Sequence, residues 1–273
     1  MSSVTPLDGG RLRGRLANGE LTIGTFVGLG TPVSAEVAAA SGVDWIVLDL
    51  EHGGVTEDQI GPTAVATGAY GVATIVRVET AARIRIGRAL DAGAAGVMLP
   101  RLDTVDQITE ALRHLKYPPL GDRGVATYNR ASRWGRDVHA LTRSASEVLG
   151  IVQIESVSSL RAVDSIAAID GVDVLFIGPL DLSFDLGLPR QFASPVFREA
   201  TEGVVDAARK NGKVAGILAA DAAAACDYRD RGFRFVAVAS DSTLLAAAVA
   251  SAVDEIDVGH RVVARPPKDH EEE

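Results

Sequence analysis

The feature that most constrains this 273-residue chain is a set of eight short, apolar, β-rich runs alternating with helical patterns. Several runs are almost entirely apolar, which is typical of strands covered on both faces. They span residues 22–27, 45–50, 74–78, 96–99, 150–154, 174–177, 214–218 and 235–239. Strict alternation indicates a parallel sheet with crossover helices, and eight units are the number that closes into a barrel. The sequence therefore predicts an α/β fold, a single (β/α)₈ TIM barrel.

Helices are predicted between these runs, at 33–41, from 56, and at 80–92, 103–115, 158–168, 195–210, 221–231 and 241–253. Thr31 and Pro32 have the pattern of an N-cap followed by proline at the first helical position. The alternative fold is an open, doubly wound sheet. It often carries a G-x-G-x-x-G fingerprint after its first strand, and Gly24, Gly28 and Gly30 do not have that spacing.

The expected barrel occupies residues 1–256, and an acidic, flexible tail follows at 257–273. A long segment at 117–148 stands outside the alternation. It carries Arg123, Arg130, Arg133, Arg136 and Arg143. Arginines in this segment could contact a second carboxylate on a substrate or a neighbouring subunit. The alternative is a solvated basic surface.

The net charge of −9 and the pI of 5.1 argue against a nucleic-acid partner, since no basic tract could follow a phosphate backbone. No apolar run reaches the roughly 18 residues that a membrane span needs. The first 16 residues lack the apolar core of an export signal. The single cysteine, Cys226, is expected to be buried and unreactive. Together these features favour a cytoplasmic protein.

Polar side chains gather where the predicted strands end. Chemistry in such barrels is located at the carboxyl ends of the strands. A charge inside an apolar strand is costly unless it is paired or bound to a metal. The residues at these ends are Asp49, Glu51 and His52 in the second unit, Arg77 in the third, Gln153 and Glu155 in the fifth, and Asp181 in the sixth. Each alone could have a structural role such as an ion pair, but seven such groups on one face indicate a site.

Glu155 and Asp181 are the candidate metal ligands. Two carboxylates without a thiol or imidazole cluster suit a hard cation that keeps waters and takes substrate oxygens. Mg²⁺ or Mn²⁺ is expected, with Co²⁺ as an alternative. His52 and Asp49, three residues apart, could form an imidazole–carboxylate dyad that acts as a general base. The alternative for His52 is a helix-capping role.

Lysine placement argues against a covalent imine mechanism. That mechanism needs a lysine at the carboxyl end of a strand. Lys210 and Lys213 precede the seventh strand, and Lys116 and Lys268 lie outside the strands. After the last strand, Asp241 presents a carboxylate where a substrate phosphate would sit. An unphosphorylated substrate is therefore expected.

Several motifs, in order along the chain, together resemble the HpcH/HpaI aldolase family of metal-dependent (class II) pyruvate aldolases. They are DWIVLDLEH at 44–52, IVRV at 75–78, YPP at 117–119, GDRG at 121–124, RWG at 133–135, QIE at 153–155 and IGPLDLS at 177–183. The resemblance covers about residues 21–253. Members include 4-hydroxy-2-oxoheptanedioate and 2-dehydro-3-deoxy sugar acid aldolases. It implies a TIM barrel and a homo-oligomer, usually a hexamer built from dimers that exchange one barrel helix.

The resemblance also implies residue roles. Glu155 and Asp181 would bind the metal, Arg77 would contact the pyruvate oxygen, and His52, supported by Asp49, would handle the proton of the aldol hydroxyl. The residues expected to contact substrate are Gln153, Gly178, Pro179, Leu180 and Arg123. Leu180 replaces an alanine usual in the family and is expected to narrow the pocket.

The expected reaction cleaves or forms a 4-hydroxy-2-oxo acid, with pyruvate and an aldehyde as its small-molecule partners. One alternative is a lyase of the same superfamily that acts on a malyl- or citramalyl-type thioester. A second is a 2-oxo acid decarboxylase. An alternative of another class is a non-catalytic barrel that serves as a binding or assembly protein.

Overall fold

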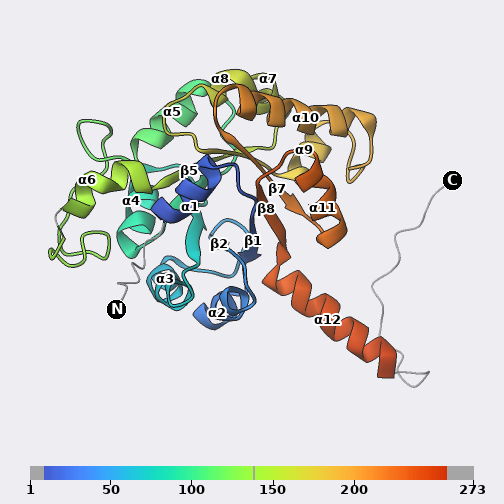
Figure 1. Ribbon diagram of the computed structural model, residues 1–273, viewed down its shortest axis with the longest axis horizontal. Helices are drawn as coiled ribbons and strands as arrows, with labels where there is room; N and C mark the ends of the chain where they lie inside the picture. The colour runs from blue at the N-terminus through green and yellow to red at the C-terminus, as the bar shows by residue number, and fades with distance from the viewer. Residues whose placement is uncertain (1–8, 138, 257–273) are drawn as a thin grey trace.

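The eight strands form one closed parallel barrel, in which each strand pairs with the next and β8 pairs with β1 (Figure 1). The structure, a computed structural model, describes residues 9–137 and 139–256. The strands are β1 (Thr22–Val27), β2 (Trp45–Asp49), β3 (Ala73–Arg77), β4 (Gly96–Leu99), β5 (Leu149–Ile154), β6 (Val174–Ile177), β7 (Val214–Ala219) and β8 (Phe235–Ser240). Each strand begins and ends within one residue of the predicted run. The predicted (β/α)₈ barrel is therefore confirmed.

The two-residue period of the strands divides the apolar side chains between two cores. Trp45, Val47 and Ile75 belong to a cluster that fills the barrel interior. Ile46 and Val76, their neighbours along the chain, belong to the larger cluster between the barrel and its helices. Strands covered on both faces explain why the runs lack alternation in hydrophobicity.

The packing of the Trp45 ring requires a glycine at position 24 of β1. Its ring lies 3.7 Å from that of Phe235, centroid to centroid, and its indole nitrogen donates to Thr22. A Cβ added at Gly24 would lie 2.2 Å from the indole ring. Gly24 is therefore required for this packing, independently of any nucleotide-binding fingerprint.

Helices surround the barrel, and most were expected. They are α2 (Pro32–Ala40), α3 (Ile60–Gly68), α4 (Arg83–Ala92), α5 (Val105–Arg113), α7 (Val157–Arg161), α8 (Val163–Ala167), α10 (Pro195–Lys210), α11 (Ala222–Asp230) and α12 (Asp241–Ile256). Thr31 caps α2 by accepting a hydrogen bond from the Val33 amide, as predicted. The helix predicted at 158–168 is two helices, because the backbone leaves helical geometry at Ala162.

Three helices were not predicted: α1 (Gly9–Ala17), α6 (His139–Glu147) and α9 (Pro179–Asp185). They lie outside the segments that join one predicted strand to the next by a clear helical pattern: before β1, in the long segment before β5, and directly after β6. Leu12 and Leu16 of α1 pack into the interior cluster with Trp45, Leu149 and Phe235, the first residues of their strands. Helix α1 therefore closes the amino-terminal end of the barrel.

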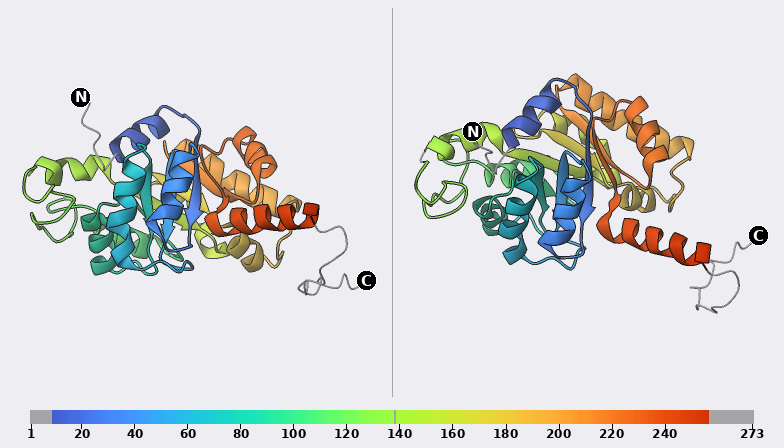
Figure 2. Two further views of the ribbon diagram at one scale, coloured as in Figure 1. Left: turned by 90° about the horizontal axis from the view of Figure 1, so that it is seen from below. Right: turned by 60° about the horizontal axis from the view of Figure 1, so that its bottom comes forward.

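Helix α12 runs away from the barrel instead of packing along it (Figure 2). From Ser242 to Ile256 its residues are exposed, including Leu244, Leu245 and Val249. The other helices of (β/α) units bury side chains against the barrel. The exposed apolar residues of α12 therefore lack the cover that such a helix normally obtains.

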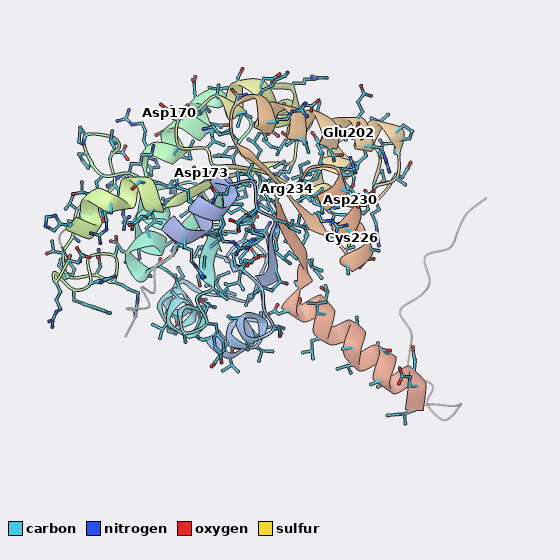
Figure 3. The ribbon with its side chains drawn as sticks, viewed as in Figure 1. Asp170, Asp173, Glu202, Cys226, Asp230 and Arg234 are labelled. Atoms are coloured by element: carbon cyan, nitrogen blue, oxygen red, sulfur yellow. The ribbon has the colours of Figure 1, made fainter. Side chains whose placement is uncertain are left out.

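The structure tests the expected burial of Cys226 but does not describe the acidic tail. Cys226 is exposed on α11, so the expectation that it is buried is wrong (Figure 3). The Ala-rich α11 has little apolar contrast between its faces, and Tyr228 is its buried residue instead. The acidic tail at 257–273 lies outside the described residues. Among the helices that the structure describes, none is long and apolar enough to cross a bilayer.

Candidate functional site

The same alternation that fills the barrel interior carries polar residues to its carboxyl end. In β2, Trp45 and Val47 are followed on the same face by Asp49, and in β3, Ala73 and Ile75 are followed by Arg77. Asp49 and Arg77 are direct partners in the β2–β3 register. Position 153 of β5 continues the interior series of Leu149 and Ile151 in the same way.

Arg77 joins the two acids that end β2. Its Nε and Nη2 donate to Asp49 Oδ1 and Oδ2 at 2.8 and 2.7 Å, and its Nη1 lies 3.2 Å from Glu51 Oε2. Its guanidinium also lies over the Phe26 ring, 5.1 Å from the centroid. Burial alone would raise the pKa of Asp49, but the hydrogen bonds and charge of Arg77 hold it below the usual value.

The carboxylate nearest to the His52 ring is that of Glu51, not Asp49. His52 Nε2 lies 3.7 Å from Glu51 Oε2, and the His52 side chain is 67% exposed. Asp49 accepts the backbone N–H of His52 at 3.3 Å and engages Arg77 with both oxygens. The expected His52–Asp49 dyad is therefore not formed, because strand pairing directs Asp49 to Arg77. Burial raises the pKa of Glu51, against the lowering charge of Arg77.

Glu155 is the most perturbed acid at this end of the barrel. It is 5% exposed, accepts the Arg101 backbone N–H on Oε1 at 2.6 Å, and accepts Gln153 Nε2 on Oε2 at 2.8 Å. Burial raises its pKa to about 7, and the charges of Asp181 and Glu51 add to the increase. A buried carboxyl with acidic neighbours is a group that a cation would stabilise.

Asp181 reaches the site from the first turn of α9. Its side chain is 44% exposed, and Arg101 Nη1 lies 3.5 Å from its Oδ1. Gly178 and Pro179 start this helix beside Glu155. A Cβ at Gly178 would lie 2.8 Å from Glu155 Oε2, so glycine permits the close approach of this turn. The Leu180 side chain is 51% exposed.

These residues fit a hard divalent cation held by two carboxylates. In the part of the chain that the structure describes, no group of three or more His, Cys, Asp or Glu residues is arranged to hold a metal. Glu155 and Asp181 alone would leave several positions for waters and substrate oxygens, as Mg²⁺ and Mn²⁺ sites commonly do. Gln153 Oε1, buried and without a hydrogen-bond partner, adds an unused acceptor beside Glu155.

The Arg123 side chain is buried against other residues than those of the candidate metal site. Its side chain is 1% exposed, its Nη2 donates to Asp91 at 2.6 Å, and its guanidinium lies 4.5 Å from the Tyr117 ring centroid. This burial argues against a contact with substrate or with a neighbouring subunit. It instead ties the segment after α5 to Asp91 of α4.

Glu51 and Arg101 have contacts in the candidate site that the sequence did not predict. Glu51 was recognised only as an acid at a strand end, and it bridges Arg77 and His52. Arg101 follows β4 with a φ of 48°, an uncommon value for a residue other than glycine, and it contacts both Glu155 and Asp181. A basic residue two positions after a strand was the available signal for Arg101.

The raised pKa of Glu155 predicts a pH-dependent stability of the metal-free protein. The folded state holds this proton up to about pH 7, whereas an unfolded glutamate releases it near 4.5. Stability is therefore lost as the pH rises through this window, by about 3 kcal/mol. Urea unfolding in EDTA at several pH values measures it. The Glu155→Gln variant should lack this component, and parallel profiles for the two proteins would contradict the assignment.

Comparisons with known proteins identify the family of this chain. The family model described as HpcH/HpaI aldolase/citrate lyase matches residues 22–248. A 2-keto-3-deoxy-L-rhamnonate aldolase of Salmonella gallinarum is 35% identical over 86% of this chain and 89% of its own. A hydroxypyruvate/pyruvate aldolase of Deinococcus radiodurans is 39% identical, over 85% and 84%.

Among solved structures, a family protein from Burkholderia cenocepacia superimposes with a TM-score of 0.86. It is 35% identical and covers 90% of this chain and 98% of its own. The match therefore extends over the whole barrel. The chain belongs to the HpcH/HpaI aldolase/citrate lyase family.

Proposed function

We propose that this protein is a divalent-metal-dependent aldolase that cleaves or forms 4-hydroxy-2-oxo acids, with pyruvate and an aldehyde as the other partners. The observation that carries this proposal is the buried carboxyl of Glu155, placed within electrostatic reach of Asp181 and Arg77. Relatives named as aldolases, similar over most of their length, support the reaction class.

Glu155 and Asp181 would hold the cation, and Gln153 would line the site. When bound, the cation supplies positive charge to the carboxylate and 2-oxo oxygens of the substrate. Three N–H groups of Arg77 point to Asp49 and Glu51. Its other N–H groups would be available to the same 2-oxo oxygen. Its fixed orientation would place a second positive charge beside the negative charge that develops on this oxygen. Pro179 has no backbone N–H. The backbone amides of Leu180 and Asp181 would therefore hold the substrate carboxylate.

His52 is the proposed proton acceptor for the 4-hydroxyl group, with Glu51 beside its ring. Its exposure suits a group at the mouth of the site, where the aldehyde leaves. His52→Asn is expected to lower cleavage by roughly 10²–10⁴-fold. It should leave intact the metal-dependent exchange of pyruvate methyl protons in D₂O, because enolisation of pyruvate does not involve the 4-hydroxyl. Loss of both activities to the same extent would remove this role.

The direct test is pyruvate release coupled to lactate dehydrogenase, with added Mg²⁺, Mn²⁺ or Co²⁺. The substrates should include sugar-derived 2-oxo-3-deoxy acids and 4-hydroxy-2-oxo diacids. Metal-dependent release from at least one substrate is expected. Full activity in EDTA would overturn the metal proposal. Cleavage of a malyl- or citramalyl-type thioester, with no release from the oxo acids, would favour the alternative lyase. The expected cytoplasmic location stays a prediction.

We also propose that α12 packs against a second copy of the chain. A groove of about 460 Å³ beside its first turns is lined largely by apolar side chains, among them Val37, Val43 and Leu245. The rest of α12 continues away from the barrel with its own apolar residues exposed. Two copies could each supply the helix that covers the other's groove. A hexamer built from such dimers stays a prediction.

Leu245→Asp combined with Val249→Asp is expected to disrupt this assembly, because charges would enter an apolar interface. Light scattering after size exclusion should show an oligomer for the wild type and a species near 28.5 kDa for the variant. Ser251→Asp is the matched control on another side of the same helix. A monomeric wild type would contradict the proposal.

A further inference from the structure

A second cavity lies at the amino-terminal end of the barrel, opposite the candidate site. Its volume is about 750 Å³, within the range of small-molecule pockets. It is bounded by α1, by the starts of β5 and β7, by the end of α10 and by the turns that precede β7 and β8. Figure 3 shows Asp173, Arg234 and Asp230, three of its lining residues, close to this end.

The cavity is rich in cations although the chain has a net charge of −9. Its cationic lining residues are Arg13, Arg209, Lys213, Arg231 and Arg234, and its acidic ones are Asp173 and Asp230. Asp173 is already bonded to Arg13 and to the Gly150 amide, and Asp230 is bonded to Arg229. Arg209 and Arg231 also pair with acids outside the lining, which leaves Lys213 and Arg234 as the lining cations without an ion pair among the described residues.

Two of these cations, Lys213 and Arg234, form no ion pair with a described acid, although Asp173 and Asp230 lie close enough to act on them electrostatically. The amine of Lys213 forms neither an ion pair nor a hydrogen bond within residues 9–137 and 139–256. Arg234 donates through Nη1 to the carbonyl oxygens of Arg229 and Phe233 and forms no ion pair with a described acid. The Nε atoms of Arg13 and Arg231 are buried and also lack hydrogen-bond partners. Those two atoms are closed off from the cavity, so the donors available to a ligand are the Lys213 amine and the N–H groups that Arg234 does not use. An anion with several oxygens would accept hydrogen bonds from both side chains.

We propose that this cavity binds a small, multiply charged oxyanion, of the phosphorylated or polycarboxylate class. Leu16, Leu149 and Val172 give it an apolar wall for the body of such a molecule. Arginine and lysine side chains provide the donors that recognise phosphate and carboxylate groups. The ligand would join α1 to the turns before β7 and β8. Because Leu12 and Leu16 of α1 close the barrel interior, binding should stabilise the fold.

Pyrophosphate and citrate are suitable probes, with acetate at matched ionic strength as the singly charged reference. Titration calorimetry and thermal unfolding of the full chain should be done in EDTA, so that neither probe acts by chelating a metal. Saturable binding and a concentration-dependent rise in melting temperature are expected for at least one probe. Binding of pyrophosphate alone would assign the phosphorylated class, and binding of citrate alone the polycarboxylate class. Saturable binding of neither would overturn the proposal.

The Lys213→Gln variant, alone and combined with Arg234→Gln, localises the binding. The double variant is expected to bind at least about tenfold more weakly, because two charge-assisted contacts are lost. The matched control is Lys210→Gln with Arg161→Gln, two cations outside the cavity lining. Lys213 forms no ion pair or hydrogen bond among the described residues, so the single variant is expected to change the charge of the site with little effect on the fold. Equal affinity in wild type, single and double variants would contradict the assignment.

Discussion

Replacing Glu155 with Gln, or Asp181 with Asn, is expected to reduce metal-dependent pyruvate release by at least about a thousandfold. Each substitution keeps the size of the side chain and removes one of the two negative charges proposed to hold the cation. The loss should be severe because no larger ligand cluster exists among the residues that the structure describes. Steady-state kinetics and calorimetric titration with Mn²⁺ measure the two consequences separately.

The control for these variants is Glu199→Gln, which makes the same chemical change at an exposed position on α10. It should retain the activity and Mn²⁺ affinity of the wild type. Removing the metal from the wild type with EDTA should reproduce the loss, and added Mg²⁺ or Mn²⁺ should restore activity. Wild-type turnover and Mn²⁺ affinity in Glu155→Gln would be incompatible with the proposed site.

Arg77→Lys is expected to lower kcat by roughly 10²–10³-fold although the positive charge is kept. Lysine cannot reproduce the paired hydrogen bonds to Asp49 while also reaching Glu51 and the substrate. The buried Asp49 would be left partly unpaired, which should also cost about 3 kcal/mol of folding stability. Kinetics at saturating metal and urea unfolding measure these effects.

Asp49→Asn in the Arg77→Lys background separates the two effects. Removing the buried charge should recover part of the stability and none of the kcat, because the guanidinium is still absent. Recovery of kcat in the double variant would mean that Arg77 acts only by pairing with Asp49. A kcat for Arg77→Lys within about threefold of the wild type would rule out the proposed contact with the 2-oxo oxygen.

Much of the site was predictable because it depends on local spacing along strands. Position 49 follows Trp45 and Val47, and position 77 follows Ala73 and Ile75, so a two-residue period alone carries both side chains into the barrel. Gln153 obeys the same rule in β5. Asp181 was found from its place after a strand, although the short helix α9 that carries it was not predicted. Arg123 shows the converse, since a charged residue in a long segment gives no signal that it will be buried against Asp91.

The amino-acid sequence by itself determined the eight strands, their closure into a barrel and the face on which the acids gather, because these depend on periodicity and on strand count. Only the tertiary structure decided which charges meet. Strand register pairs Asp49 with Arg77 and leaves Glu51 beside His52, and the backbone after β4 brings Arg101 to Glu155. The cationic cavity likewise joins α1 to turns about 200 residues later in the chain. Contacts of this kind depend on register and on chain folding in three dimensions, which local spacing does not contain.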